Sequence, residues 1–142
     1  MSTPDTLSAP AVAADPAAPN RPAPPDGIVG ALGRFAAEVR AEGLDRRLRV
    51  EAAARVLDVV GNSLIAHDEP VAQSVLQVAR RWAGTGPASV IGAPDRLPAA
   101  SAALVNGTLA HAMDFDDSHM RSVLHPSASV IPAALAAAQA SG

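Results

Sequence analysis

The stretch AASAALVNGTLAHAM, residues 99–113, decides the fold class of this chain. It is apolar on nearly all sides of a helix, and such a helix is normally buried among other helices. Pro98 is suited to its first turn, and Asp95 is expected to cap it. The small pair Asn106-Gly107 would let a neighbouring helix approach closely. The stretch therefore predicts an all-α, Ala-rich helical bundle.

Apolar residues at 3–4 spacing predict four further helices around this one. Asp45 is expected to cap the second helix, on which Glu51 and Arg55 form an i,i+4 ion pair. Residues 88–91 are read as a short extended piece, and no sheet is expected. The predicted helices cover 27–43, 45–66, 70–82 and a segment that begins at Pro126.

The first 26 residues differ from the rest in composition, because seven prolines deny them both helix and sheet ladders. They also hold few large apolar groups. We expect 1–26 to be a disordered Ala/Pro-rich tail, and 27–142 to be part of one helical domain. The tail does not resemble a signal peptide, so a cytoplasmic location is the default.

The composition of the chain excludes several kinds of site and of partner. The chain has 142 residues, no Cys and a formal net charge of -3, and each of its 11 basic residues is Arg. Absence of Cys removes disulfides, thiolate nucleophiles and iron–sulfur clusters. A mildly acidic chain without a long apolar run predicts neither nucleic acid nor a membrane as partner.

The segment 111–126 is expected to carry the chemistry, because three carboxylates and three imidazoles follow an apolar helix there. Carboxylates at a helix C-terminus oppose the helix dipole, and such uncompensated departures mark functional sites. His125 precedes the helix-starting Pro126, where the dipole favours a neutral imidazole that can relay a proton. Asp114 is expected to be buried at the opposite kind of helix end, four residues before Ser118 on one helical face. Asp114 and His125 are therefore predicted to share a cavity.

Simpler interpretations stand beside this one. His111 is expected to be a core histidine hydrogen-bonded to Asp114, and His119 a solvated loop residue. Asp116 and Asp117 either end the helix and cap the following turn or belong to a substrate site. A metal site formed by Asp114, Asp117, His119 and His125 is a rival use of the segment, but its spacing matches no standard helical ligand pair.

The residues Asn106-Gly107-Thr108, the run from His111 to His119, His125-Pro126-Ser127 and Pro132-Ala133 resemble the N-terminal helical domain of the MmgE/PrpD family. The resemblance covers roughly 28–142. It implies a homodimeric lyase that dehydrates 2-methylcitrate or decarboxylates cis-aconitate without metal or organic cofactor. It also implies a large helical domain and a smaller α/β lid.

The resemblance assigns roles by position. It places Asp114 at the catalytic centre and His125 as an acid–base or substrate-contacting group, with Ser118 matching a hydroxyl residue that is more often Thr. We further expect Ser118, Arg121 and Asp117 to contact a small tri- or dicarboxylate.

The chain departs from the family in length. The resemblance implies further catalytic His, Lys and Tyr residues beyond Gly142, and this sequence has neither Lys nor Tyr. We therefore expect a fragment or a chain that needs a partner. Two hypotheses follow: a lyase, or part of one, that eliminates water from a polycarboxylate, and a non-catalytic helical module that packs with another chain.

Overall fold

The computed structural model describes residues 27–39 and 43–142, and the chain divides into two units between Leu44 and Asp45. The predicted tail, 1–26, lies outside the described residues. The first unit contributes one helix, α1 (Gly27–Glu38), none of whose residues is buried. This helix ends earlier than the predicted boundary at Gly43.

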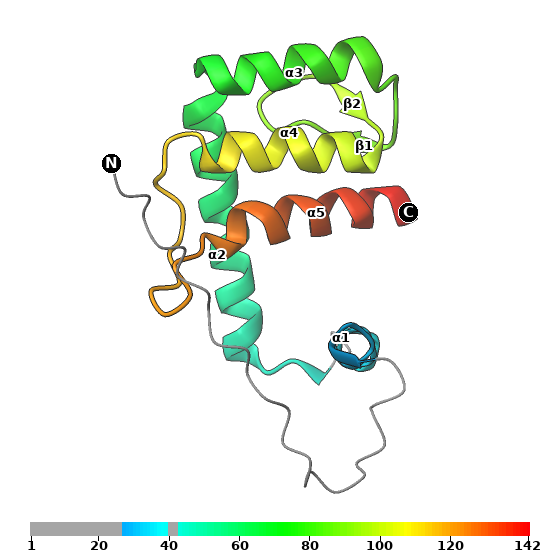
Figure 1. The fold of residues 1–142 in the computed structure, drawn as a ribbon, viewed down its shortest axis with the longest axis vertical. Coiled ribbons are helices and arrows are strands. Elements are labelled where there is room, and N and C mark those ends of the chain that lie inside the picture. Colours follow the sequence, from blue (N-terminus) through cyan, green and yellow to red (C-terminus); the bar gives the residue numbers. More distant parts are fainter. Residues whose placement is uncertain (1–26, 40–42) are drawn as a thin grey trace, which may run out of the picture. The chain divides into compact units, whose positions relative to one another are not determined.

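The second unit is a bundle of helices, as the sequence predicts. In Figure 1, α4 lies between α3 and α5, and α2 runs across the ends of α4 and α5. No helix in the described ranges has both the length and the apolar character that a membrane crossing requires. The elements are α2 (Arg46–Ile65), the 3-10 turn η2 (Ala66–Asp68), α3 (Pro70–Trp82), α4 (Ala99–His111) and α5 (Pro126–Ser141).

Local signals predicted for α2, α3 and α5 are confirmed. The Asp45 side chain accepts a hydrogen bond from the Leu48 amide at 2.8 Å, which caps α2. Arg55 pairs with Glu51 one turn before it, at 2.9 Å. Pro70 and Pro126 each begin a helix, where a missing N–H costs nothing.

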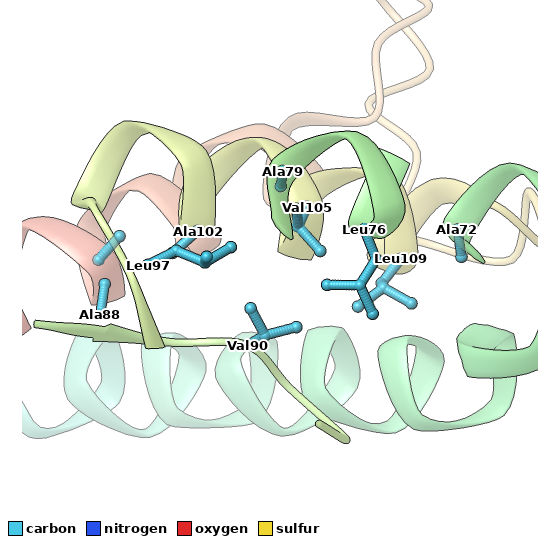
Figure 2. Close-up of a cluster of buried hydrophobic side chains, with 10 residues drawn as sticks. Ala72, Leu76, Ala79, Ala88, Val90, Leu97, Ala102, Val105 and Leu109 are labelled. Carbon is cyan, nitrogen blue, oxygen red and sulfur yellow. The ribbon is translucent and has the colours of Figure 1, made fainter. Parts of the chain in front are cut away.

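The core of the second unit is built from small and medium aliphatic side chains. Figure 2 shows Leu76 of α3 meeting Leu109 and Val105 of α4, with Val90 facing them from the segment between the helices. A smaller cluster joins Val59 of α2 to Ala110 and Ala128. Because alanines fill much of both clusters, the helices approach closely and few large side chains carry the packing.

Gly107 is the point of close approach between α4 and α5, as its small size predicts. A Cβ at this position would lie 3.0 Å from the carbonyl oxygen of Ala128. Pro132 stands four residues after Ala128 inside α5 and has no N–H to donate to that carbonyl. The missing side chain of Gly107 therefore leaves room for a carbonyl that cannot receive the usual helical hydrogen bond from the residue four positions later.

The expectation of no sheet is wrong in one detail. Two short strands, β1 (Ala88–Ser89) and β2 (Arg96–Leu97), pair antiparallel between α3 and α4. The buried Asn106 of α4 accepts a hydrogen bond from the Ile91 amide and donates one to the Ser89 carbonyl, both at 2.9 Å. These two hydrogen bonds hold the segment of β1 and β2 against α4. Asn106 and its partners are 15 and 17 residues apart in the chain, so local sequence pattern does not predict the contact.

Asp95 does not cap α4, contrary to the sequence prediction. Pro98 occupies the N-cap position instead, because Arg96 and Leu97 are extended in β2 and separate Asp95 from the helix. The Asp95 carboxylate accepts two hydrogen bonds from Arg80 of α3, at 2.8 and 2.7 Å. These bonds, and the guanidinium charge, hold the pKa of Asp95 below its usual value.

Asp95→Asn is expected to destabilise the fold at neutral pH and to have little effect in strong acid. A carboxyl with a lowered pKa in the folded state adds stability above its unfolded pKa, about 3.9. That contribution is lost as pH falls through the folded pKa. Arg80 is half exposed, so the loss should be about 1 kcal/mol or less. Urea unfolding at neutral and at strongly acidic pH measures it, with the exposed Asp58→Asn as control. An equal loss at both pH values would contradict the assignment.

Candidate functional site

The connection between α4 and α5, residues 112–125, carries the candidate site. The fourth helix ends at His111, two residues before the predicted end, and the Asp114 amide closes a turn onto the His111 carbonyl at 2.9 Å. Asp114 and Val123 both adopt φ of 52°, in the left-handed region. This conformation is tolerated by aspartate but is unusual for a β-branched valine. Such backbone outliers are enriched at functional sites.

The left-handed turn corrects the predicted placement of Asp114. Asp114 is not on a helix, so it does not share a helical face with Ser118. Its side chain is 80% exposed rather than buried, because the chain leaves the bundle directly after His111. The predicted burial of this carboxylate is therefore wrong, although its position beside His125 is not.

The structure brings Asp114 and His125 together. The Nε2 of His125 lies 3.8 Å from Oδ1 of Asp114. His125 is the N-cap residue of α5, as predicted, but its side chain makes no capping hydrogen bond. The ring is thus free of its own helix and faces the connection.

Asp116 is the buried carboxylate of the site, and its side chain is 0% exposed. Its carboxylate pairs with Nδ1 of His111, at 3.0 Å to Oδ1 and 3.3 Å to Oδ2. Nδ1 of His125 lies 3.3 Å from the same Oδ1. The sequence prediction that His111 pairs with Asp114 is wrong. Because the chain turns at Asp114, that side chain is exposed and Asp116 lies beside both imidazole rings.

Asp117 fastens the connection to the bundle. One of its oxygens accepts a hydrogen bond from the Ser127 amide at 3.0 Å, in the first turn of α5, and the other pairs with Arg55 of α2. It therefore caps α5 from outside the helix and neutralises a cation on α2. Both oxygens have protein partners, and the expected substrate contact of Asp117 stays a prediction.

The other predicted contact residues lie on the outer part of the connection. Ser118, His119 and Arg121 are exposed. Nδ1 of His119 contacts the Ser122 hydroxyl at 2.6 Å, and a backbone bridge joins His119 to Leu124. None of these three residues lines the hollow described next. Their proposed contacts with substrate carboxylates stay predictions.

A hollow of about 910 Å³ lies beside the Asp114–His125 pair. Val71 of α3, Leu104 of α4 and Leu124 of the connection give it mostly apolar walls. His111, Asp114 and His125 are the titratable residues that line it. An apolar hollow with a few convergent polar groups is the usual form of a small-molecule site.

The same groups could hold a cation. Ligand atoms of His111, Asp114, Asp116 and His125 all lie within 4.8 Å of one another. Of the rival metal set expected from the sequence, Asp114 and His125 belong to this group, whereas the side chains of Asp117 and His119 contact other residues, and metal binding stays a prediction. The sequence analysis named His111 and Asp116 but did not predict that they pair, because their approach depends on the turn at Asp114. A carboxylate flanked by histidines five and nine residues away is too common a pattern to have identified them.

Comparison with known proteins gives consistent results. A family model described as the MmgE/PrpD N-terminal domain matches residues 30–142. Cis-aconitate decarboxylases of Mus musculus and Homo sapiens are each 36% identical to this chain over 86 residues, which is 60% of it. The matched stretch spans 17% of the mouse protein and 18% of the human protein, so the likeness concerns a small part of those enzymes.

Proposed function

The chain belongs to the MmgE/PrpD family, and on that premise we propose that its α4–α5 connection contributes part of the active site of a lyase for small polycarboxylates. The observation that supports this most is the approach of His125 to Asp114 at the edge of the hollow. The reaction class is elimination of water from a hydroxy-polycarboxylate, with decarboxylation of the unsaturated relative as the related alternative.

Elimination of water needs two proton transfers. A base removes a proton from the carbon next to a carboxylate, and an acid protonates the departing hydroxyl. We assign removal of the carbon-bound proton to Nε2 of His125 and protonation of the departing hydroxyl to Asp114, which must carry a proton for this step; the two atoms are 3.8 Å apart, so a small substrate can contact both. Removal of the proton places negative charge on the substrate carboxylate, which a cation or a hydrogen-bond donor must stabilise.

The charges that line the hollow indicate that further positive charge must come from another part of the active site. Among the described residues that line the hollow, only the two imidazoles can carry positive charge, and Asp114 opposes an anionic ligand. Arg121 and Ser118 are proposed to contact substrate carboxylates from the outer part of the connection. We propose that a second chain or subunit supplies further cations, as in a homodimer. The alternative, a non-catalytic module that packs with another chain, uses the same partner without turnover.

Ligand titration tests the proposal. Adding cis-aconitate or 2-methylcitrate to the ¹⁵N-labelled chain is expected to shift the amide signals around His111, Asp114 and His125. His125→Ala should weaken binding by about tenfold or more, because a charged hydrogen bond contributes roughly 1.5–3 kcal/mol. The exposed His119→Gln is the matched control and should bind as the parent does.

The outcomes separate the two hypotheses. Saturable binding that depends on His125 supports a substrate site, and turnover is then assayed with the isolated chain and with candidate partner chains. If neither polycarboxylate shifts the hollow signals, the non-catalytic module is favoured. If His119→Gln weakens binding as much as His125→Ala does, the assignment of His125 is wrong.

Divalent cation binding is a second candidate, supported by the four close ligand atoms of His111, Asp114, Asp116 and His125. Two imidazoles and two carboxylates suit zinc, manganese or iron. Titration of the chelator-treated chain with zinc and with manganese, followed by calorimetry, tests it. Stoichiometric binding that is lost in His111→Ala would favour this candidate, and heat unchanged by that substitution would exclude this site as its origin.

A further inference from the structure

We propose that Asp116 is a positioning residue, which holds His111 and His125 in the tautomer that carries its proton on Nδ1 and leaves Nε2 free as a base. The inference deepens the proposed function and rests on it for its catalytic meaning. The hydrogen arrangement itself is a property of the folded chain and is tested without turnover.

Because the Asp116 carboxylate is buried, it needs hydrogen-bond donors from the protein. Its side chain is fully buried, and an isolated charge in that position would be strongly unfavourable. Nδ1 of His111 lies within hydrogen-bond distance of both of its oxygens. Since an ionised carboxylate only accepts, His111 must donate from Nδ1, which fixes the proton of a neutral ring on that atom.

Nδ1 of His125 has the same acceptor available. It is a buried atom with no formed hydrogen bond among the described residues. Oδ1 of Asp116 lies 3.3 Å away, but the ring is turned so that its N–H does not point along that line. A small rotation of the ring would satisfy both groups. The rings of His111 and His125, 5.1 Å apart, would then share one buried carboxylate.

Two carboxylates compete for the proton of His125, and they favour opposite tautomers. Asp114 lies 3.8 Å from Nε2 and is 80% exposed, whereas Asp116 lies 3.3 Å from Nδ1 and is fully buried. Both the shorter distance and the lower local dielectric make Asp116 the stronger influence. Asp117 does not compete, because Arg55 and the Ser127 amide engage its oxygens.

His125 would therefore be a base whose free Nε2 faces the hollow. With its proton on Nδ1, neutral His125 presents the lone pair of Nε2 towards Asp114 and the space beside it. A carboxylate that fixes the tautomer of a histidine in this way is a common arrangement in acid–base and metal sites. His111 gains the same tautomer and becomes a second residue at the hollow with a free Nε2.

Nitrogen NMR of the histidine rings tests the proposal. Long-range ¹H–¹⁵N spectra of the 142-residue chain, recorded with chelator at a pH where the rings are neutral, distinguish the two tautomers. We expect His111 and His125 to be mainly Nδ1–H, although neutral imidazole in water prefers Nε2–H. In Asp116→Asn the Nδ1–H form of His125 should fall from the majority to the minority. Asp114→Asn, which removes an equal charge near the same ring, should leave it in the majority.

Each outcome decides the matter. A parent chain in which His125 is mainly Nε2–H overturns the proposal without any variant, so a poorly folded Asp116→Asn does not remove the test. A tautomer that changes in Asp114→Asn but not in Asp116→Asn also overturns it. Ligand titration fails or succeeds independently, because absence of polycarboxylate binding would leave the tautomers as they are. The failure of either proposal can therefore be told from failure of the other.

Discussion

Leu109→Ala is expected to lower the free energy of unfolding by about 2–5 kcal/mol, the usual cost of a cavity in a well-packed core. Leu109 is 1% exposed, on the last full turn of α4, and belongs to the cluster shown in Figure 2. Because this core contains few large side chains, the neighbouring alanines have little freedom to fill the space. Urea unfolding followed by circular dichroism measures the loss.

Leu104→Ala is the matched control on the same helix. Leu104 is 62% exposed, so its truncation should change the stability by about 0.5 kcal/mol or less. The two variants remove the same atoms and alter helix propensity equally, so their difference isolates burial. Similar losses in both variants would show that α4 is not seated in the core as described.

The Leu109→Ala substitution should also disturb the candidate site. His111 lies two residues further on, at the end of α4, and its ring pairs with the buried Asp116. A loosened last turn would release that pairing before the whole domain unfolds, because helix ends open at lower cost than helix centres. The ring signals of His111 in Leu109→Ala, below its unfolding transition, would report this change.

Gly86→Ala is expected to be the second most damaging substitution, with a loss of about 3 kcal/mol. A Cβ at this position would overlap the backbone of Leu97 and Pro98, where the chain leaves β2 for α4. Backbone atoms have no alternative rotamer, so relief requires moving the strand, and overpacking of this kind typically costs 1–3 kcal/mol or more. Thermal and urea unfolding of the variant measure the effect.

Gly61→Ala is the control for Gly86→Ala and should change stability in the opposite direction. Gly61 lies inside α2, and a Cβ there would meet nothing within 4 Å. Alanine should therefore stabilise the helix by about 0.5–1 kcal/mol. If both substitutions destabilise the chain to the same degree, the close contact at Gly86 is not the cause.

The α4–α5 connection combines a fixed inner part with an exposed outer part. Asp116 and Asp117 are held by contacts to three helices, whereas Ser118 and Arg121 are exposed. The left-handed residues Asp114 and Val123 lie near the two ends of this connection. Asp116 of the inner part pairs with the imidazoles, and the contacts proposed for the outer part, with a ligand or with a partner chain, stay predictions.

Local pattern determined the helices because their causes are local. Apolar residues at 3–4 spacing, prolines at helix starts and the Asp45 cap lie within one or two turns of the features that they specify. The buried nature of α4 followed from its lack of a polar face, and the close approach at Gly107 from residue size. The family resemblance was likewise carried by residues that are adjacent in the chain, and the family model confirms it.

The tertiary structure decided which carboxylate pairs with which histidine or arginine side chain. From the sequence, Asp114 was expected to be buried and to pair with His111, and Asp95 to cap α4. In the fold, Asp114 is exposed, Asp116 is buried under both imidazoles, and Asp95 binds Arg80. One left-handed residue at the end of α4 redirects every carboxylate that follows it, and composition leaves no mark of such a turn when the residue is not glycine. Side-chain partners separated by a loop depend on that backbone direction, whereas the signals that pattern and start a helix are local, so the sequence predicted the bundle and the approach of His125 to Asp114, and the fold decided which carboxylate is buried beside the imidazoles.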